Sequence, residues 1–178
     1  MVKPLPVLTL ALALALPHAP PKTTAPPRPT VLQAAEGERR VLRAGKAPLI
    51  LKIDPKNTGS QHMIFGWEDI PPGDGIPTHH HLDADEIVFI HKGTATVTLG
   101  DREYEAHEGA VVFIPKGTWI GVRNKSQAPM TMVFAFPQPG FEEFLRSVSA
   151  PEGGQEPQLS ATERARLERQ HHIVYKRR

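Results

Sequence analysis

Alternating apolar and polar residues in the middle of the chain indicate β-strands. Over residues 93–99, three threonines alternate with Ala95, Val97 and Leu99. This is the period-two pattern of a strand that buries one face. A glycine and an aspartate at 100–101 predict a tight turn, so we expect residues 102–106 to return as the second strand of a hairpin.

Other short apolar runs are separated by proline and glycine, which predicts further strands between turns. They include residues 48–54, 61–70, 87–90, 110–114, 119–124 and 130–136. About nine short strands are expected within residues 48–137, and no long helical pattern interrupts them. The fold class is therefore expected to be all-β, a sandwich or a barrel. One more short strand is expected around Val41.

Helical patterns are expected only after the last long strand. Residues 140–148 place Phe141, Phe144, Leu145 and Val148 on one face, as in a helix that packs on the outside of a barrel. A capping box that begins at Ser160 opens a second helix, expected to run toward residue 170. Two histidines at 171–172 suggest metal binding, but favourable placement near a helix C-terminus, or simple exposure, explains them better.

The start of the chain has a different composition from the rest. Residues 7–16 form an apolar run of signal-peptide length, too short to cross a bilayer as a helix. We expect residues 1–16 to be a signal peptide and the protein to be exported, to the periplasm or outside the cell. The alternatives are an uncleaved interfacial anchor or a mis-assigned start codon.

The remaining chain divides into three expected parts. Residues 17–47 are a disordered linker and N-terminal extension, proline-rich at its start. Residues 48–137 form the barrel, and residues 138–178 form a helical C-terminal extension. A length of 178 residues suits one domain with such extensions.

Composition excludes several classes of function. The chain has no cysteine, so disulfides and thiolate metal sites are ruled out. A formal net charge of +2 is too balanced to suggest a nucleic-acid partner. No membrane span is expected once the signal peptide is removed, and the expected partner is a small-molecule ligand or substrate.

One stretch carries candidate metal ligands. His79 and His81 are two residues apart, so on an extended strand both imidazoles point to the same face. Glu86 follows a short polar break and opens an apolar run. Two imidazoles and one carboxylate that converge from adjacent strands make a plausible site for a divalent metal ion.

The spacing of these residues resembles the cupin superfamily. Residues 73–93 resemble its first motif, with glycines at both ends around His79, His81 and Glu86. Residues 109–124 resemble its second motif, with Gly109, a Pro-x-Gly at 115–117 and a later asparagine. The resemblance implies a double-stranded β-helix, or jelly-roll barrel, often dimeric. It also implies one metal ion, commonly iron, manganese, nickel, copper or zinc, bound by His79, His81 and Glu86.

The second motif departs from the family pattern at one position. The family normally has a third histidine three residues after the glycine of Pro-x-Gly, and here that position is Ile120. We expect Ile120 to form part of an apolar wall. The other expected members of this wall are Val88, Ile90, Val97, Leu99 and Phe113. His62, on the preceding strand, is a weaker candidate to replace the missing ligand.

Two functional interpretations follow from this departure. In the first, the open metal position takes substrate or dioxygen, and the protein is a dioxygenase-like or isomerase-like enzyme that acts on a small organic molecule. In the second, the loss of an imidazole weakens the metal site, and the barrel is a non-catalytic binding or sensing module. No catalytic residue is assigned beyond the metal ligands, and the sequence does not identify the metal.

Overall fold

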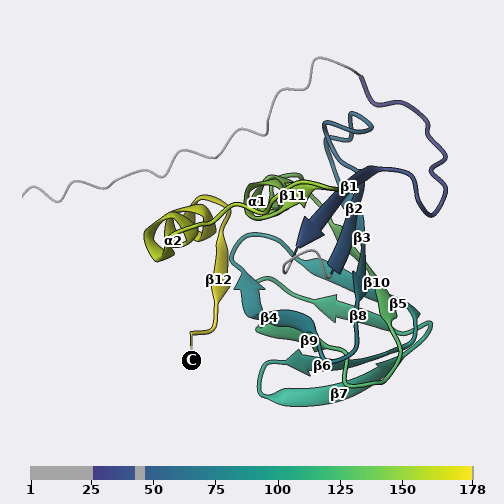
Figure 1. Ribbon diagram of the computed structural model, residues 1–178, viewed down its shortest axis with the longest axis vertical. Coiled ribbons are helices and arrows are strands. Elements are labelled where there is room, and N and C mark those ends of the chain that lie inside the picture. The colour runs from purple at the N-terminus through teal and green to yellow at the C-terminus, as the bar shows by residue number, and fades with distance from the viewer. Residues whose placement is uncertain (1–25, 43–46, 178) are drawn as a thin grey trace, which may run out of the picture.

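The computed structural model describes residues 26–42 and 47–177. The expected signal peptide, residues 1–16, lies outside this part of the chain. Within it, two antiparallel sheets face each other (Figure 1). One has the strand order β11-β1-β2-β3-β10-β5-β8 and the other the order β12-β4-β9-β6-β7. This arrangement confirms the expected all-β, jelly-roll architecture.

The bounds of the elements follow the predicted runs closely. The strands are β1 (Glu38–Leu42), β2 (Ala47–Ile53), β3 (Ile64–Ile70), β4 (Gly75–His81), β5 (Glu86–Lys92), β6 (Thr94–Leu99), β7 (Arg102–His107), β8 (Val111–Ile114), β9 (Ile120–Arg123), β10 (Met130–Phe136), β11 (Ala150–Pro151) and β12 (Ile173–Tyr175). The helices are α1 (Phe141–Val148) and α2 (Ala161–Gln170). Neither is long and apolar enough to cross a membrane.

The core fills the space between the two sheets. In the β6–β7 hairpin, Leu99 pairs with Arg102 across the predicted turn, and Ala95 and Val97 are buried as the alternation requires. The largest fully buried apolar side chains come from both sheets: Leu49, Leu51, Ile64, Ile70, Ile90, Ile120, Met130, Met132 and Phe136.

The segment after the barrel contains both expected helices and two short strands, β11 and β12, that were not expected. The capping box is present, because the Ser160 side chain accepts from the Glu163 backbone N–H and the Glu163 side chain accepts from Ser160 N–H. After α2, β12 adds to the edge of β4 and pairs Ile173 with His81 and Tyr175 with His79. A three-residue strand is too short to give a periodic signal, so sequence patterns could not reveal it.

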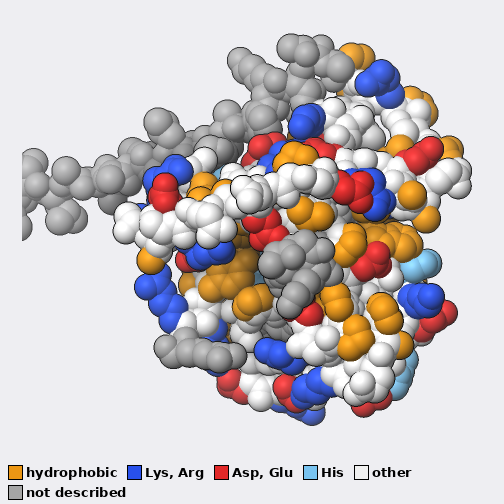
Figure 2. All heavy atoms as spheres, in the orientation of Figure 1, with side chains coloured by type: hydrophobic (Ala, Val, Ile, Leu, Met, Phe, Trp, Pro, Cys, Tyr) orange, Lys and Arg blue, Asp and Glu red, His pale blue; other side chains and the backbone are white. Residues whose placement is uncertain are grey.

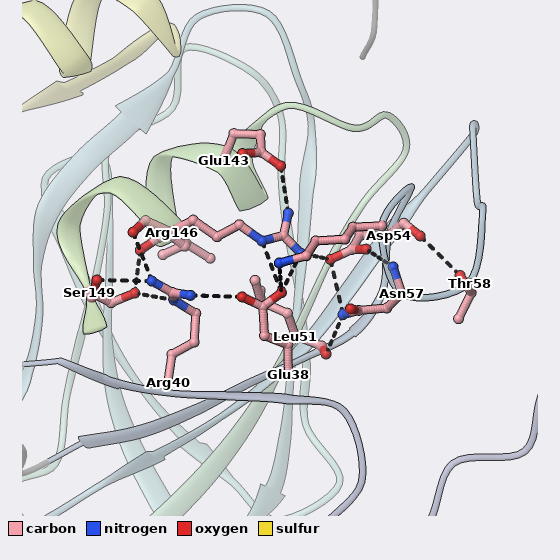
Figure 3. Close-up of polar contacts among 11 residues, drawn as sticks. Glu38, Arg40, Leu51, Asp54, Asn57, Thr58, Glu143, Arg146 and Ser149 are labelled. Carbon is pink, nitrogen blue, oxygen red and sulfur yellow. Dashed lines mark hydrogen bonds and ion pairs between the residues drawn. The ribbon is translucent and has the colours of Figure 1, made fainter. Parts of the chain in front are cut away.

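A buried ionic network holds α1 against β1 and β2 (Figure 3). Arg146 of α1 donates to Glu38 through Nε and Nη2, at 3.0 and 2.7 Å, and Nη2 also donates to Asp54. Arg40 donates to the other oxygen of Glu38 at 2.7 Å and to Ser149 Oγ at 2.6 Å. Residues far apart in sequence thus fix the position of α1.

Burial and ionic contacts shift the pKa values of the charged groups in this network in opposite directions. Burial acts to raise the pKa of Glu38, but hydrogen bonds and charges from Arg146, Arg40 and Lys56 outweigh it and leave the pKa lowered. Burial similarly acts to lower the pKa of Arg146, and its acidic partners raise it instead. Both side chains are therefore charged at neutral pH, and each depends on the other.

A buried lysine ties the segment before β1 to the barrel. The ammonium of Lys52, on β2, donates to the carbonyl oxygens of Gln33, Ala34 and Glu36 at 2.8 to 2.9 Å. Burial lowers the pKa of Lys52, and its three acceptors satisfy all three N–H donors of the ammonium.

Candidate metal centre

The candidate ligands come from strands that belong to different sheets. His79 and His81 lie on β4, in the five-stranded sheet, and their alternation turns both imidazoles inward. Glu86 is the first residue of β5, in the seven-stranded sheet, after a four-residue reversal. The site therefore bridges the two sheets inside the barrel.

The three side chains converge as the sequence predicts. One ligand atom from each of His79, His81 and Glu86 lies within 4.8 Å of the other two. Nε2 of His81 is 3.7 Å from Oε2 of Glu86, and the two imidazole rings meet edge to face at 5.1 Å. All three residues are at most 6% exposed, so they form a compact donor set of a size that one metal ion can bridge.

The hydrogen bonding at the site leaves the metal-facing atoms available. Nδ1 of His79 donates to the carbonyl oxygen of Pro77 at 2.8 Å, which fixes the tautomer whose Nε2 carries a lone pair. Within residues 26–42 and 47–177, Nε2 of His81 and Oε2 of Glu86 have no hydrogen-bond partner although both are buried. Each unsatisfied buried atom costs about 1–3 kcal/mol, and a bound cation would remove that cost. The residues present thus fit a metal ion.

Burial sets the protonation of the candidate ligands. Removal from water lowers the pKa of His79 to about 4 and, together with the neighbouring imidazoles, that of His81 to about 3. Both rings are therefore neutral at pH 7, the form that binds a metal. Burial and the nearby charge of Glu68 raise the pKa of Glu86 to about 8, so a metal ion that binds here displaces a proton from Glu86.

A cavity of about 570 Å³ opens onto His79 and Glu86. Most of its wall is apolar and aromatic: Leu42, Ile76, Met132, Phe134, Phe141, Phe144, Leu145 and Val148. The barrel and α1 supply these side chains, while α2 and the segment that follows add Arg164, Glu168 and Tyr175. Figure 2 shows hydrophobic side chains recessed between α2 and the barrel, with charged side chains around them. The volume suits a small organic molecule.

Ile120 occupies the place where the family pattern has a histidine. It is 1% exposed and stands opposite His79 in the pairing of β4 with β9. Val88, Ile90 and Val97 are also buried, as expected of the apolar wall. The expectation for Phe113 is wrong, since its side chain is 60% exposed. On β8, Val112 and Ile114 face the core, so Phe113 points outward.

Among residues 26–42 and 47–177, the other histidines do not join the site. His62 is exposed and precedes β3, so it does not replace the missing ligand. His80 packs on Trp119 with ring centroids 4.3 Å apart, on the face of β4 opposite to that of the ligands. Nδ1 of His172 lies 2.7 Å from Asp83, and that of His171 lies 3.2 Å from the Gly140 carbonyl oxygen.

Two residues at the cavity were missed in the sequence. Glu68 on β3 is buried and lines the same cavity as Glu86. Strand alternation could have found it, because it shares the inward face with Ile64 and Ile70. Tyr175 lies with its ring 5.4 Å from that of His79, and only the β12–β4 pairing brings it there.

Comparison with known proteins agrees with this geometry. The model of the cupin domain family matches residues 66–136. Among curated proteins, the tetracenomycin polyketide synthase protein TcmJ of Streptomyces glaucescens is 21% identical over 82 residues, which cover 46% of this chain and 55% of that protein. Protein SchB of Streptomyces halstedii is 27% identical over 82 residues, or 46% and 59% of the two chains. The chain thus matches little more than half the length of these relatives.

Solved structures show the same fold at low sequence identity. A predicted oxalate decarboxylase of Thermotoga maritima superposes with a TM-score of 0.55 at 16% identity, over 62% of this chain and all of that one. A cupin sugar phosphate isomerase of Silicibacter pomeroyi gives 0.56 at 17% identity, over 62% and 77%. The motif spacing, the two-sheet barrel and the family match agree, and residues 66–136 of the chain form a cupin domain.

Proposed function

We propose that this protein binds one divalent transition-metal ion through His79, His81 and Glu86 and acts on a small organic molecule held in the adjoining cavity. The observation that carries the proposal is the pair of buried atoms, His81 Nε2 and Glu86 Oε2, that have no hydrogen-bond partner in the described residues and converge with His79. The candidate ions are iron, manganese, nickel, copper and zinc, all of which accept imidazole and carboxylate ligands.

Each residue of the site has a part in this proposal. The bound ion would supply Lewis-acid chemistry and, for a redox-active metal, electron transfer. Neutral imidazoles at His79 and His81 and the carboxylate of Glu86 would hold the ion from one side. With isoleucine at position 120, opposite His79, the position of a fourth protein ligand would be free for substrate. The apolar wall excludes water, which strengthens electrostatic interactions at the centre.

We propose a dioxygenase-like or isomerase-like reaction for this site. A two-histidine, one-carboxylate set with open positions is the donor arrangement of non-haem iron oxygenases. Names among similar proteins point in several directions, because they include an oxalate decarboxylase, a sugar phosphate isomerase and a polyketide synthase protein. One fold hosts many reactions, so the reaction has to be identified from the site.

The second candidate is a non-catalytic module that binds or senses a small ligand. The buried Ile120 favours it, because a missing imidazole weakens metal affinity. The cavity wall favours it equally, since an aromatic pocket holds an apolar ligand without any metal.

Replacing Ile120 with histidine distinguishes these two candidates. In the metalloenzyme, Ile120→His should tighten metal binding about tenfold or more, because an imidazole donor is added next to His79. It should also suppress turnover, because the added ligand takes the substrate position. Metal affinity is measured by calorimetry, and turnover by oxygen uptake and proton exchange over a panel of small hydroxy and keto acids.

The matched control is Ile70→His, which buries an imidazole at the end of β3, opposite Met130 and away from the strand ends that carry the candidate ligands. It should leave metal affinity unchanged. If Ile120→His tightens metal binding but the wild-type protein turns over none of the panel, the binding module becomes the better description. If Ile120→His changes metal affinity no more than Ile70→His does, the assignment of the open position to Ile120 is wrong.

We also propose that the protein is exported. The proposal rests on the apolar run at residues 7–16, which lies outside the described residues. Expression of the full chain with sequencing of the mature N-terminus tests it. Cleavage near residue 16 with recovery outside the cytoplasm is expected, and an intact N-terminus on cytoplasmic protein would contradict it.

A further inference from the structure

Strand β8 is an open edge of the barrel. It ends the seven-stranded sheet, where it pairs with β5 on one side only, among the strands of residues 26–42 and 47–177. Just before β8, the N–H of Ile90 donates to the carbonyl oxygen of Ala110 at 2.9 Å. Because bonded residues alternate along an antiparallel pair, Val112 also bonds toward β5. The N–H and C=O groups of Val111 and Phe113 therefore point to the open edge.

The side chains along this edge are apolar. Val111 is 65% exposed and Phe113 is 60% exposed, and their neighbours on β5 are Phe89 and Ile87. A groove of about 410 Å³ between β7 and β8 continues the apolar surface on the other side of the edge. Free sheet edges are usually protected by lysine, proline or an inward-pointing charge, and β8 contains none of these. Such an edge favours pairing with another strand.

The sequence around β8 is complementary to itself. When a strand pairs antiparallel with a second copy, a two-fold axis relates the two, and residues equally far from the axis on either side face each other. An axis at Val112 sets Val111 of one copy opposite Phe113 of the other, and the backbone groups of both point to this edge. The same axis sets Glu108 opposite Lys116, and these exposed residues carry opposite charges.

We propose that β8 pairs antiparallel with β8 of a second copy of this chain, about a two-fold axis at Val112, and that the two seven-stranded sheets thereby become one. Valine and phenylalanine side chains make the cross-strand contacts, and an ion pair closes each end of the interface. Pro115 has no N–H, so the ladder of hydrogen bonds ends there. This inference does not depend on the proposed metal site.

Sedimentation equilibrium of the purified chain at several concentrations measures the association. The wild type should dimerise reversibly. Phe113→Lys should raise the dissociation constant of the dimer at least about 100-fold, because a charged side chain on a sheet edge prevents pairing. The matched control is Met63→Lys, which replaces another exposed apolar side chain, before β3. It should leave the dissociation constant within about twofold of the wild type, as surface substitutions away from an interface do.

Exchange of the two charges tests the register. Glu108→Lys or Lys116→Glu alone should raise the dissociation constant about tenfold, because like charges then replace both exposed ion pairs of the dimer. The double variant Glu108→Lys/Lys116→Glu sets opposite charges against each other again. Its dissociation constant should return to within about twofold of the wild type, since only the direction of each ion pair has changed.

Introduced cysteines test the same register by covalent capture, because the chain has no cysteine of its own. A mixture of the Val111→Cys and Phe113→Cys proteins should form a disulfide-linked dimer on mild oxidation, since Cα atoms of a hydrogen-bonded pair lie about 5.5 Å apart. Val111→Cys alone should not, because its two copies would lie about 9 Å apart. The control mixture is Phe113→Cys with Val31→Cys, whose position is 84% exposed and far from β8 in the sequence.

Three outcomes would overturn the proposal. The first is a wild-type protein that is monomeric at every concentration. The second is a dimer whose dissociation constant is the same in Phe113→Lys, because the interface would then lie on another surface. The third is a charge exchange that fails to restore association, together with a disulfide in Val111→Cys alone, which would exclude the axis at Val112.

Discussion

Replacing both His79 and His81 with alanine should abolish metal binding, with the affinity for any divalent transition-metal ion falling at least about 1,000-fold. The reason is that outer-sphere partners already contribute about 10- to 100-fold, and these imidazoles are two of the three proposed direct donors. Their rings are buried and neutral, and the Nε2 atom of His81 has no hydrogen-bond partner in the described part of the chain. Glu86 alone cannot hold an ion against water.

Elemental analysis by mass spectrometry, followed by calorimetric titration with Fe²⁺, Mn²⁺, Ni²⁺, Cu²⁺ and Zn²⁺, measures this effect. The control is the double variant His62→Ala/His107→Ala, which removes two imidazoles from exposed positions. It should keep the wild-type metal content. If the His79→Ala/His81→Ala variant retained its metal, the metal site would have to lie elsewhere in the chain. If the wild-type protein took up none of the five ions, the proposed metal-dependent function would be wrong.

Replacing Arg146 with methionine should lower the free energy of unfolding by about 3–5 kcal/mol, the usual cost of breaking a buried ion pair from one side. Asp54 is fully buried and Glu38 is largely buried, so the variant would leave two carboxylates without their main cation. Because α1 also supplies Phe141, Phe144 and Leu145 to the cavity wall, loosening it should disturb the site as well as the fold.

Urea denaturation of the variant and the wild type gives the difference directly. Arg39→Met is the control, because the Arg39–Glu152 pair is 39% and 56% exposed and such pairs contribute at most about 1 kcal/mol. A similar decrease in the free energy of unfolding in both variants would contradict the prediction that the buried network stabilises the fold more than the exposed ion pair does.

Acid should reduce the effect of Arg146→Met. Glu38 has a lowered pKa in the folded state, so its contribution to stability is complete above its unfolded pKa of about 4.5 and is lost as the pH falls through the lowered value. The difference in unfolding free energy between the wild type and the variant should therefore shrink below about pH 4.5.

The sequence predicted the parts of this protein that depend on local spacing. The alternation over residues 93–99 predicted the β6–β7 hairpin, and the i, i+2 spacing of His79 and His81 placed both rings on one face. Ile120 is buried, as expected of a residue on the inner face of its strand. Phe113 was misassigned, because a one-residue error in strand parity exchanges the buried and exposed faces.

The residues that the sequence did not reveal are brought to the site by long-range pairing. Glu68 faces the ligands only because β3 lies beside β10, which in turn pairs with β5. Tyr175 reaches His79 only because β12 adds to the edge of β4. Alternation alone would place Glu68 on the inward face of β3 but not beside the candidate ligands, because both relations join segments that are distant along the chain.

The pairing of β12 with β4 has a consequence for how the protein matures in the cell. Without β12, the strand that carries His79 and His81 would be an edge strand, open on one side. During synthesis it stays in that condition until residues 173–175 have left the ribosome, long after both cupin motifs are complete. The proposed metal site would thus be completed only on the arrival of a segment outside the residues that the family model matches. A barrel interrupted before that point would present an unpaired strand to its neighbours instead of a finished site.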